Sequence, residues 1–176
     1  MTTAIPDDRP LILVTLSGGG WHRETARILE YFPKHRFRFA YVYGHCRGVH
    51  GAARLSMPHE GPRHAMHYLG PTRRHPVRFI TNTLRFGLSV LEAFSIVRRL
   101  RPHAILALGT SMALPLFAVG KAFGARRVFV ESLTRVRRLS LTGRLLYRLG
   151  FADDLYVQWP SLQQEYPKAR FAGAVL

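Results

Sequence analysis

Residues 104–132 read AILALGTSMALPLFAVGKAFGARRVFVES, and this stretch decides the fold. Ala104–Leu108 is a short apolar run, and the turn-forming residues Gly-Thr-Ser follow it at 109–111. An apolar helical pattern then extends to Phe123, where Gly124 ends it, before a second apolar run at 127–130. A strand, a helix and a second strand of this kind are typical of a parallel sheet that is buried on both faces.

The same alternation extends over the rest of the chain. The apolar patterns predict further strands at Leu11–Leu16, 38–43, 155–158 and around Phe171, and further helices at 23–31, 77–100, 142–149 and 161–166. Residues 44–76 are rich in Gly, Pro, His and Arg, and they predict a long loop with at most one short strand. We therefore expect a Rossmann-like α/β fold, in which helices cover both faces of a parallel sheet.

The composition is that of a globular protein. The chain has 176 residues, of which 47% are hydrophobic, and we expect one domain over residues 1–176. The single cysteine, Cys46, allows no internal disulfide, and no paired metal-ligand spacing occurs, so we predict neither a metal nor a cofactor. Asp7 and Asp8 precede the first apolar run, which does not fit a signal peptide. These features together predict a cytoplasmic protein.

The charge is strongly basic and unevenly distributed. There are 26 Lys and Arg against 10 Asp and Glu, a formal net charge of +16, and Glu92 is the only acid between residues 61 and 130. Such a field attracts nucleic acid, an anionic membrane surface or phosphorylated ligands. A solvated basic face without a dedicated partner is the alternative.

Three of the predicted strands end in residues suited to ligand binding. In open parallel sheets, ligands bind beyond the carboxyl ends of the strands. The residues at these ends are Gly18, Gly19 and Gly20, then Gly109, Thr110 and Ser111, then Glu131 and Ser132. The three glycines could seat phosphate oxygens on backbone N–H groups at a helix start, or they could simply form a tight turn.

Longer patterns in the second half of the chain are more specific. They read VFVESLTRVRRLSLTGRLLY at 128–147 and ADDLYVQWPSLQQEYPKARFAGAVL at 152–176. Both resemble the acceptor-side subunit of the two-chain GlcNAc transferase of dolichol-linked oligosaccharide assembly, and its bacterial relatives in capsular and exopolysaccharide synthesis. The resemblance extends over GPTRRHPVRFITNTL at 70–84 and residues 101–124, and it is weakest between 44 and 70. More distantly, the glycine loop and the Glu131 segment are similar to the N-terminal half of the lipid II-forming GlcNAc transferase.

The resemblance implies one half of a GT-B glycosyltransferase. This chain would bind a polyprenyl-diphosphate-linked acceptor, and a separate catalytic subunit would bind the UDP-sugar. The chain alone would be inactive, and it would lie on the inner face of the cell membrane. Relatives place His directly after the glycines, often followed by Trp, whereas here Trp21 precedes His22. Whether Trp21 or His22 enters the cleft is therefore left open.

Three side chains are candidates for the base that accepts the proton of the acceptor hydroxyl. His22 has an ordinary pKa of about 6.5, and Glu24 and Glu131 compete for this role or for orienting the acceptor. The alternatives are a histidine that merely faces solvent and a Glu131 carboxylate paired with Arg135 or Arg137. Because positions 22 and 131 follow predicted strands, we expect alanine at either to spare the fold.

The acceptor's diphosphate would contact the strand ends and a basic segment at 135–138. Planar guanidinium groups suit phosphate oxygens, although a solvated basic turn is the alternative. The predicted binding residues are Gly18, Gly19, Gly20, Gly109, Thr110, Ser111, Ser132, Arg135 and Arg138.

Two further segments are candidates for contacts with partners. The helix at 77–100 is apolar around most of its circumference, so it is either buried core or partly in contact with anionic lipid, with Arg73, Arg74 and Arg78 nearby. Residues 156–176 contain Trp159, Pro160, Tyr166 and Phe171, and they are the candidate docking surface for the second chain or an ordinary sheet edge.

A nucleic-acid-binding protein is the leading alternative function. The net charge fits such a protein, and a stand-alone nucleotide-binding protein of the same fold is a third reading. The sequence shows no helix-turn-helix, zinc-finger or RNP pattern, and its aromatic residues lie mostly within apolar strands and helices. We therefore expect no nucleic-acid partner.

Overall fold

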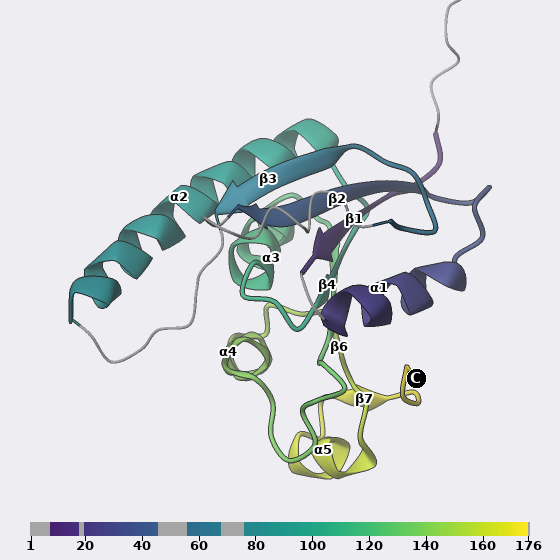
Figure 1. The fold of residues 1–176 in the computed structure, drawn as a ribbon, viewed down its shortest axis with the longest axis vertical. Coiled ribbons are helices and arrows are strands. Elements are labelled where there is room, and N and C mark those ends of the chain that lie inside the picture. The colour runs from purple at the N-terminus through teal and green to yellow at the C-terminus, as the bar shows by residue number, and fades with distance from the viewer. Residues whose placement is uncertain (1–7, 18–19, 46–55, 68–75, 176) are drawn as a thin grey trace, which may run out of the picture.

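The computed structural model describes residues 8–17, 20–45, 56–67 and 76–175, and within them seven parallel strands form one sheet. The strands lie in the order β3-β2-β1-β4-β5-β6-β7 (Figure 1). Their bounds are β1 Leu11–Leu16, β2 Arg38–His45, β3 Arg63–His67, β4 Ala104–Leu108, β5 Arg126–Val130, β6 Asp154–Val157 and β7 Arg170–Phe171. The predicted parallel sheet is confirmed, including one short strand within the long segment at 44–76.

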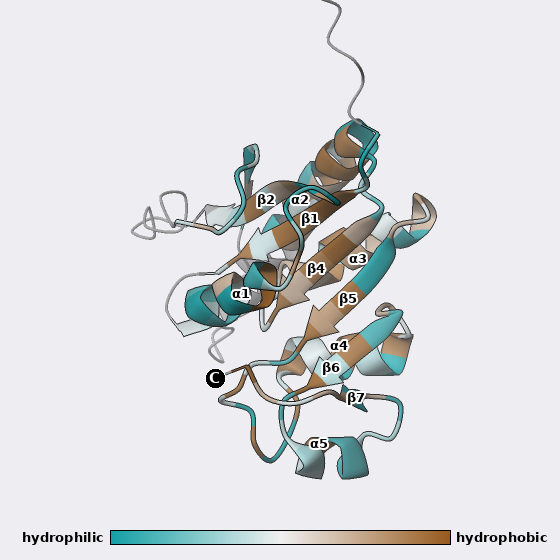
Figure 2. Cartoon of the chain, turned by 90° about the vertical axis from the view of Figure 1, so that its right-hand side faces the viewer, coloured by the Kyte–Doolittle hydropathy of each residue, from teal (hydrophilic) through white to brown (hydrophobic). Residues whose placement is uncertain are grey.

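Helices cover both faces of the sheet, as expected. Their bounds are α1 Gly20–Glu30, α2 Pro76–Leu100, α3 Ala113–Ala122, α4 Leu141–Leu149 and α5 Pro160–Glu165. Helix α1 lies on one face, and α2 and α3 lie on the other (Figure 2). In the same view the central strands β1 and β4 are largely hydrophobic, whereas α1 turns a hydrophilic surface outward.

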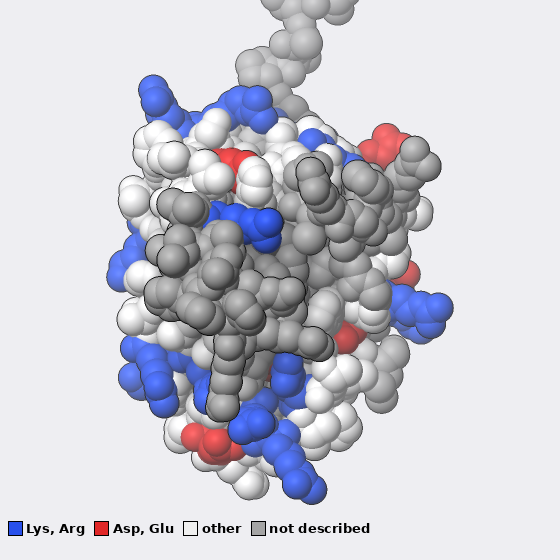
Figure 3. Space-filling model, turned by 60° about the vertical axis from the view of Figure 1, so that its left-hand side comes forward, with Lys and Arg blue, Asp and Glu red and all other residues white. Residues whose placement is uncertain are grey.

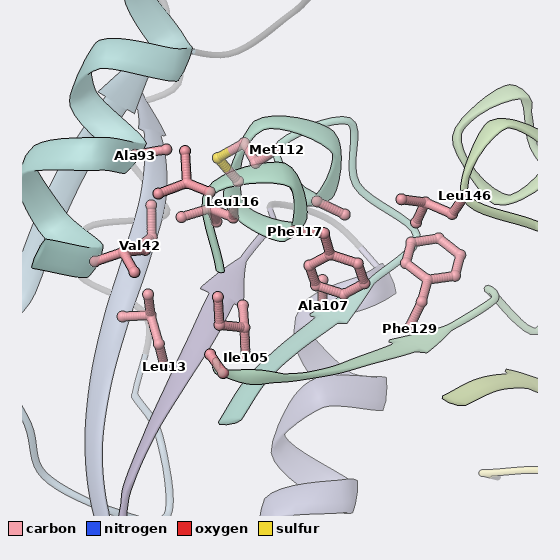
Figure 4. Packing of buried hydrophobic residues seen from close by; sticks show 14 of the residues in the cluster. Leu13, Val42, Ala93, Ile105, Ala107, Met112, Leu116, Phe117, Phe129 and Leu146 are labelled. Carbon is pink, nitrogen blue, oxygen red and sulfur yellow. The ribbon is translucent and has the colours of Figure 1, made fainter. Parts of the chain in front are cut away.

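The larger part of the core lies between the sheet and the helices α2, α3 and α4. Figure 4 shows Ile105 and Phe129 of the sheet facing Leu116 and Phe117 of α3, with Leu146 of α4 beside them. Under α1, a smaller core contains Val14, Tyr41 and Leu106 from the strands and Leu29 from the helix. Burying side chains of this size contributes about 1.5–3 kcal/mol each.

Local signals explain where two of the helices begin and end. Pro76 is the first residue of α2, a position where its missing N–H costs little. Ser140 caps α4, because its hydroxyl accepts a hydrogen bond from the Gly143 N–H at 3.0 Å. Gly150 ends α4 with φ at +60°, which glycine adopts without strain.

Helix α1 begins at Gly20, three residues earlier than predicted. Trp21 and His22 consequently lie in its first turn rather than in the loop before it. The strand order reverses between β1 and β4, since β2 and β3 lie to one side and β5, β6 and β7 to the other. The carboxyl ends of β1 and β4 therefore flank the place where ligands bind in folds of this kind.

Candidate acceptor site

Glu24 connects α1 to the carboxyl ends of β5 and β6. One of its carboxylate oxygens accepts a hydrogen bond from the Ser132 hydroxyl at 3.2 Å. The other accepts from the Leu133 N–H at 3.2 Å and from the Gln158 side-chain N–H at 2.8 Å. Glu24 is half-buried, and its carboxylate lies within this hydrogen-bonded cluster.

Glu131 lies at the end of β5, but its side chain is turned inward and has 0% exposure. Its carboxylate accepts hydrogen bonds from the Ser132 N–H at 3.1 Å, from the Ser140 N–H at 2.8 Å and from the Ser140 hydroxyl at 2.9 Å. Burial raises its pKa, while the bonds from Ser140 and Ser132 and the charge of Arg135 oppose the rise. Glu131 therefore anchors the segment between β5 and α4.

The hydrogen bonds of Glu131 differ from the alternative in which it pairs with Arg135 or Arg137. Its partners are backbone and hydroxyl groups of Ser132 and Ser140, and Arg135 acts on it only through its charge. Because the side chain is fully buried, alanine at this position cannot be expected to spare the fold.

Trp21 lies at the reversal of strand order, against the turn after β4. A Cβ atom added to Gly109 would lie 3.0 Å from the indole nitrogen of Trp21, and the φ of Gly109 is +53°. Glycine is therefore required here both for the backbone conformation and for the close approach of the indole ring. Trp21 therefore packs over the end of β4. This bears on whether Trp21 or His22 enters the cleft, because Trp21 is the one that lies against this strand end.

His22 is half-buried, and its Nδ1 atom is enclosed without a hydrogen-bond partner among the described residues. Burial lowers the pKa of His22, and the positive charges of Arg23 and Arg63 lower it further. These effects favour the neutral imidazole, the form that accepts a proton. This partial burial does not fit the alternative of a histidine that merely faces solvent.

The predicted phosphate-binding residues differ in their surroundings. Gly18 and Gly19 lie outside the described residues, whereas Gly20 is the first residue of α1. The Thr110 side chain is buried, and its hydroxyl accepts a hydrogen bond from the Met112 N–H at 3.3 Å, so it stabilises the turn into α3. Ser111 is half-buried in the same turn.

Arg135 and Arg138 are exposed on the segment that joins β5 to α4. Backbone contacts hold this segment in place: the indole N–H of Trp159 donates to the Leu133 carbonyl at 2.6 Å, and the Ser161 hydroxyl donates to the Val136 carbonyl at 3.0 Å. The guanidinium groups consequently project from a fixed backbone, an arrangement suited to binding phosphate oxygens.

Gln158 is a member of the site that the sequence reasoning missed. It directly follows β6, is 2% exposed, and donates hydrogen bonds to Glu24 and, at 2.9 Å, to the Glu131 carbonyl. The strand-end rule that selected Ser132 applies equally to the end of β6, so this residue could have been found. Among the described residues, no group of three His, Cys, Asp or Glu side chains is placed to hold a metal ion.

Comparison with known proteins identifies a family. The sequence profile described as "Oligosaccharide biosynthesis protein Alg14 like" matches residues 12–175. A mouse relative, UDP-N-acetylglucosamine transferase subunit ALG14, is 25% identical over an alignment of 187 residues. The alignment covers 97% of this chain and 85% of that protein. The resemblance read from the sequence is thus confirmed.

Solved structures with the same fold are about twice as long as this chain. MurG from Acinetobacter baumannii superimposes with a TM-score of 0.66 at 14% identity, covering 94% of this chain and 45% of that one. UGT2 from Phytolacca americana, complexed with UDP-2-fluoro-glucose and pterostilbene, superimposes with a TM-score of 0.59 at 14% identity. The superposition covers 96% of this chain and 55% of UGT2. The seven-stranded sheet therefore has the fold of one half of a GT-B glycosyltransferase.

Proposed function

Because the chain belongs to the Alg14-like family of oligosaccharide biosynthesis proteins, we propose that it is the acceptor-binding subunit of a two-chain UDP-sugar glycosyltransferase. The acceptor is a saccharide linked to polyprenyl diphosphate, and the product enters polysaccharide biosynthesis. The name of the mouse relative, UDP-N-acetylglucosamine transferase subunit ALG14, carries the proposal, since the match covers 97% of this chain and 85% of that protein. A separate nucleotide-sugar-binding subunit supplies the other side of the cleft.

The cluster around Glu24 suits the transfer step. The acceptor hydroxyl attacks the anomeric carbon of the donor sugar, a new C–O bond forms, and the bond to UDP breaks with its electron pair leaving on UDP. Glu24 accepts the proton of the attacking hydroxyl, because its side chain is only half-buried whereas that of Glu131 is fully buried. The exposed Arg135 and Arg138 contribute to binding the diphosphate of the acceptor, and His22 is the alternative base.

An apolar patch on the outer side of α2 and α3 supports association with a membrane. The patch consists of Leu88, Leu91, Phe94 and Phe123, which are 37–68% exposed. Phe94 and Phe123 pack edge to face with ring centroids 5.6 Å apart, so the two helices form one continuous surface.

The first turns of α2 extend beyond the sheet (Figure 1). Figure 3 shows a face on which Lys and Arg outnumber Asp and Glu. Arg73 and Arg74 lie outside the described residues, and only the backbone of Arg78 is described. No helix among the described residues is long and apolar enough to cross a bilayer. The protein binds peripherally to the inner face of the cell membrane, where anionic lipids attract its basic surface.

The second chain docks beside the C-terminal segment. A groove of about 390 Å³ lies between α1 and residues 172–175, and its walls are mostly apolar, including Ile28, Phe32, Val128 and Tyr156. An apolar segment of the nucleotide-sugar-binding subunit fits this groove. Of the four predicted docking residues, Trp159 and Tyr166 contact the Leu133 carbonyl and the Tyr147 ring within the chain, whereas Pro160 and Phe171 are exposed.

Reconstitution tests the proposal. Transfer from a radiolabelled UDP-sugar to a polyprenyl-diphosphate-linked acceptor is measured with each chain alone and with both together. We expect turnover with both chains and none with either chain alone. Robust turnover by this chain alone would overturn the two-chain assignment.

A further inference from the structure

Gln158 occupies a position from which it contacts three separate parts of the fold. Its side-chain N–H groups donate to the Glu24 carboxylate at 2.8 Å and to the Glu131 carbonyl at 2.9 Å. Its side-chain oxygen accepts from the Val175 N–H at 2.8 Å. A flipped amide would place oxygen against oxygen and N–H against N–H, so these partners fix the orientation of the side chain.

The bond to Glu24 is the shortest of the three that its carboxylate accepts. The bonds from Ser132 and Leu133 are both 3.2 Å long, against 2.8 Å from Gln158. A carboxylate offers roughly four acceptor positions, so at least one remains for an acceptor hydroxyl. The direction in which that position points depends on how Glu24 is held.

We propose that Gln158 is a positioning residue that orients Glu24 for the acceptor hydroxyl and couples it to the C-terminal segment at Val175. This inference rests on the proposed function, in which Glu24 belongs to the acceptor site. Val175 also lines the groove assigned to the second chain. A displacement of the C-terminal segment on docking is therefore transmitted through one buried amide to the carboxylate that receives the proton.

The coupling between the C-terminal segment and Glu24 depends on the hydrogen bond from Val175 to Gln158. Without the Val175 N–H, the Gln158 side-chain oxygen loses its donor, so the amide that donates to Glu24 is held by one partner fewer. A misplacement of about 1 Å in a catalytic group can cost on the order of 100-fold in rate. The second chain thus assists the reaction through Gln158 as well as by bringing the donor.

Two substitutions at position 158 test the proposal in the reconstituted two-chain enzyme. Gln158→Ala should lower kcat by roughly 10- to 100-fold while leaving the KM for the UDP-sugar unchanged, because the donor site lies on the other chain. Gln158→Glu keeps the shape but places a second carboxylate against Glu24. Its deficit relative to wild type should shrink as the pH falls from 8 to 6, since protonation of the introduced carboxyl restores a donor. The deficit of Gln158→Ala should stay constant over that range.

Leu149→Glu is the control, because it introduces a carboxylate at an exposed position on α4, outside the segments assigned to the substrates and to the second chain. It should retain the wild-type kcat and pH profile. Wild-type kcat and pH profile in both position-158 variants, with transfer by the wild-type enzyme intact, would overturn the inference.

A second measurement separates this inference from the proposed function. Urea unfolding of Gln158→Ala, Glu24→Ala and the double variant measures their coupling without any turnover, and we expect the two losses of stability to be non-additive. Additive losses would overturn the inference, whatever the enzyme assay shows. Non-additive losses together with absent wild-type transfer would support the contact and refute the proposed function.

Discussion

The cluster around Glu24, Glu131 and Gln158 and the apolar patch on α2 and α3 are built in opposite ways. In the cluster, buried polar side chains are joined by hydrogen bonds between residues more than 100 positions apart, such as Glu24 and Gln158. In the patch, Leu88, Leu91 and Phe94 follow one another at helical spacing and face outward. The hydrogen bonds of the cluster fix the positions of its side chains, whereas the patch exposes apolar surface to a membrane. Substitutions in the cluster should therefore affect the reaction, and substitutions in the patch should affect membrane binding.

The largest effect is expected from Glu131→Ala. Three donors, the Ser132 N–H, the Ser140 N–H and the Ser140 hydroxyl, would lose their acceptor in a buried site. We expect the free energy of unfolding to fall by about 3 kcal/mol or more, since each unpaired buried group costs about 1–3 kcal/mol. Urea unfolding measures the loss, and Glu30→Ala, at an exposed position on α1, is the control. Equal stability of the two variants would show that the cluster is not structural.

Glu24→Gln should separate chemistry from stability within the cluster. The substitution keeps the size of the side chain but removes the charge that accepts the proton. We expect kcat in the two-chain assay to fall about 100-fold or more, the usual contribution of a general base. Glu30→Gln on the same helix should leave kcat unchanged. An unaltered kcat in Glu24→Gln would exclude this carboxylate as the base.

Leu91→Asp should weaken attachment without affecting the cluster. Leu91 is 68% exposed in the patch, so a charge there costs the chain little in solution but opposes contact with acyl chains. We expect the affinity for anionic liposomes to fall about tenfold, because burying one leucine contributes at least about 1.5 kcal/mol. Tyr31→Asp, at an exposed position after α1 on the opposite face of the sheet, is the control in co-sedimentation. Equal binding by both variants would place the membrane contact elsewhere.

The smallest effect concerns His22 and the pH dependence of stability. Burial, Arg23 and Arg63 lower the pKa of His22 in the folded protein below 6.5, so the unfolded chain binds this proton more tightly. The contribution to stability is present above about pH 6.5 and is lost as the pH falls through the lowered folded pKa. The difference in unfolding free energy between wild type and His22→Gln should therefore change between pH 7.5 and 5.5. A constant difference would mean that His22 is solvated like an ordinary surface histidine.

The sequence predicted the sheet and the helices, and it suggested a candidate site, because each depends on local patterns. Apolar runs such as Ala104–Leu108 identify strands, and the polar residues after them, Glu131 and Ser132, identify the ligand-binding edge. The patch could also be read, in outline, from the helical spacing of its leucines and Phe94.

Contacts between distant residues could not be predicted in this way. The chain shows a glycine at 109, but only the fold shows that the indole of Trp21 occupies the space where a Cβ would lie. It shows a glutamate at 131, but not that Ser140 turns back to bind it. Whether a strand-end carboxylate faces the cleft or the interior depends on register and on the path of the following loop, and neither is encoded in a single short motif.

The most direct test of the central claim measures which substrate binds this chain in the absence of the second one. Fluorescence of Trp21 and Trp159 is followed while the purified chain, in detergent, is titrated separately with a short-chain polyprenyl-diphosphate-linked sugar and with UDP-GlcNAc. An acceptor-side half should bind the lipid-linked sugar saturably and show no saturable response to the nucleotide sugar. Saturable binding of UDP-GlcNAc, with none of the lipid-linked sugar, would contradict the assignment.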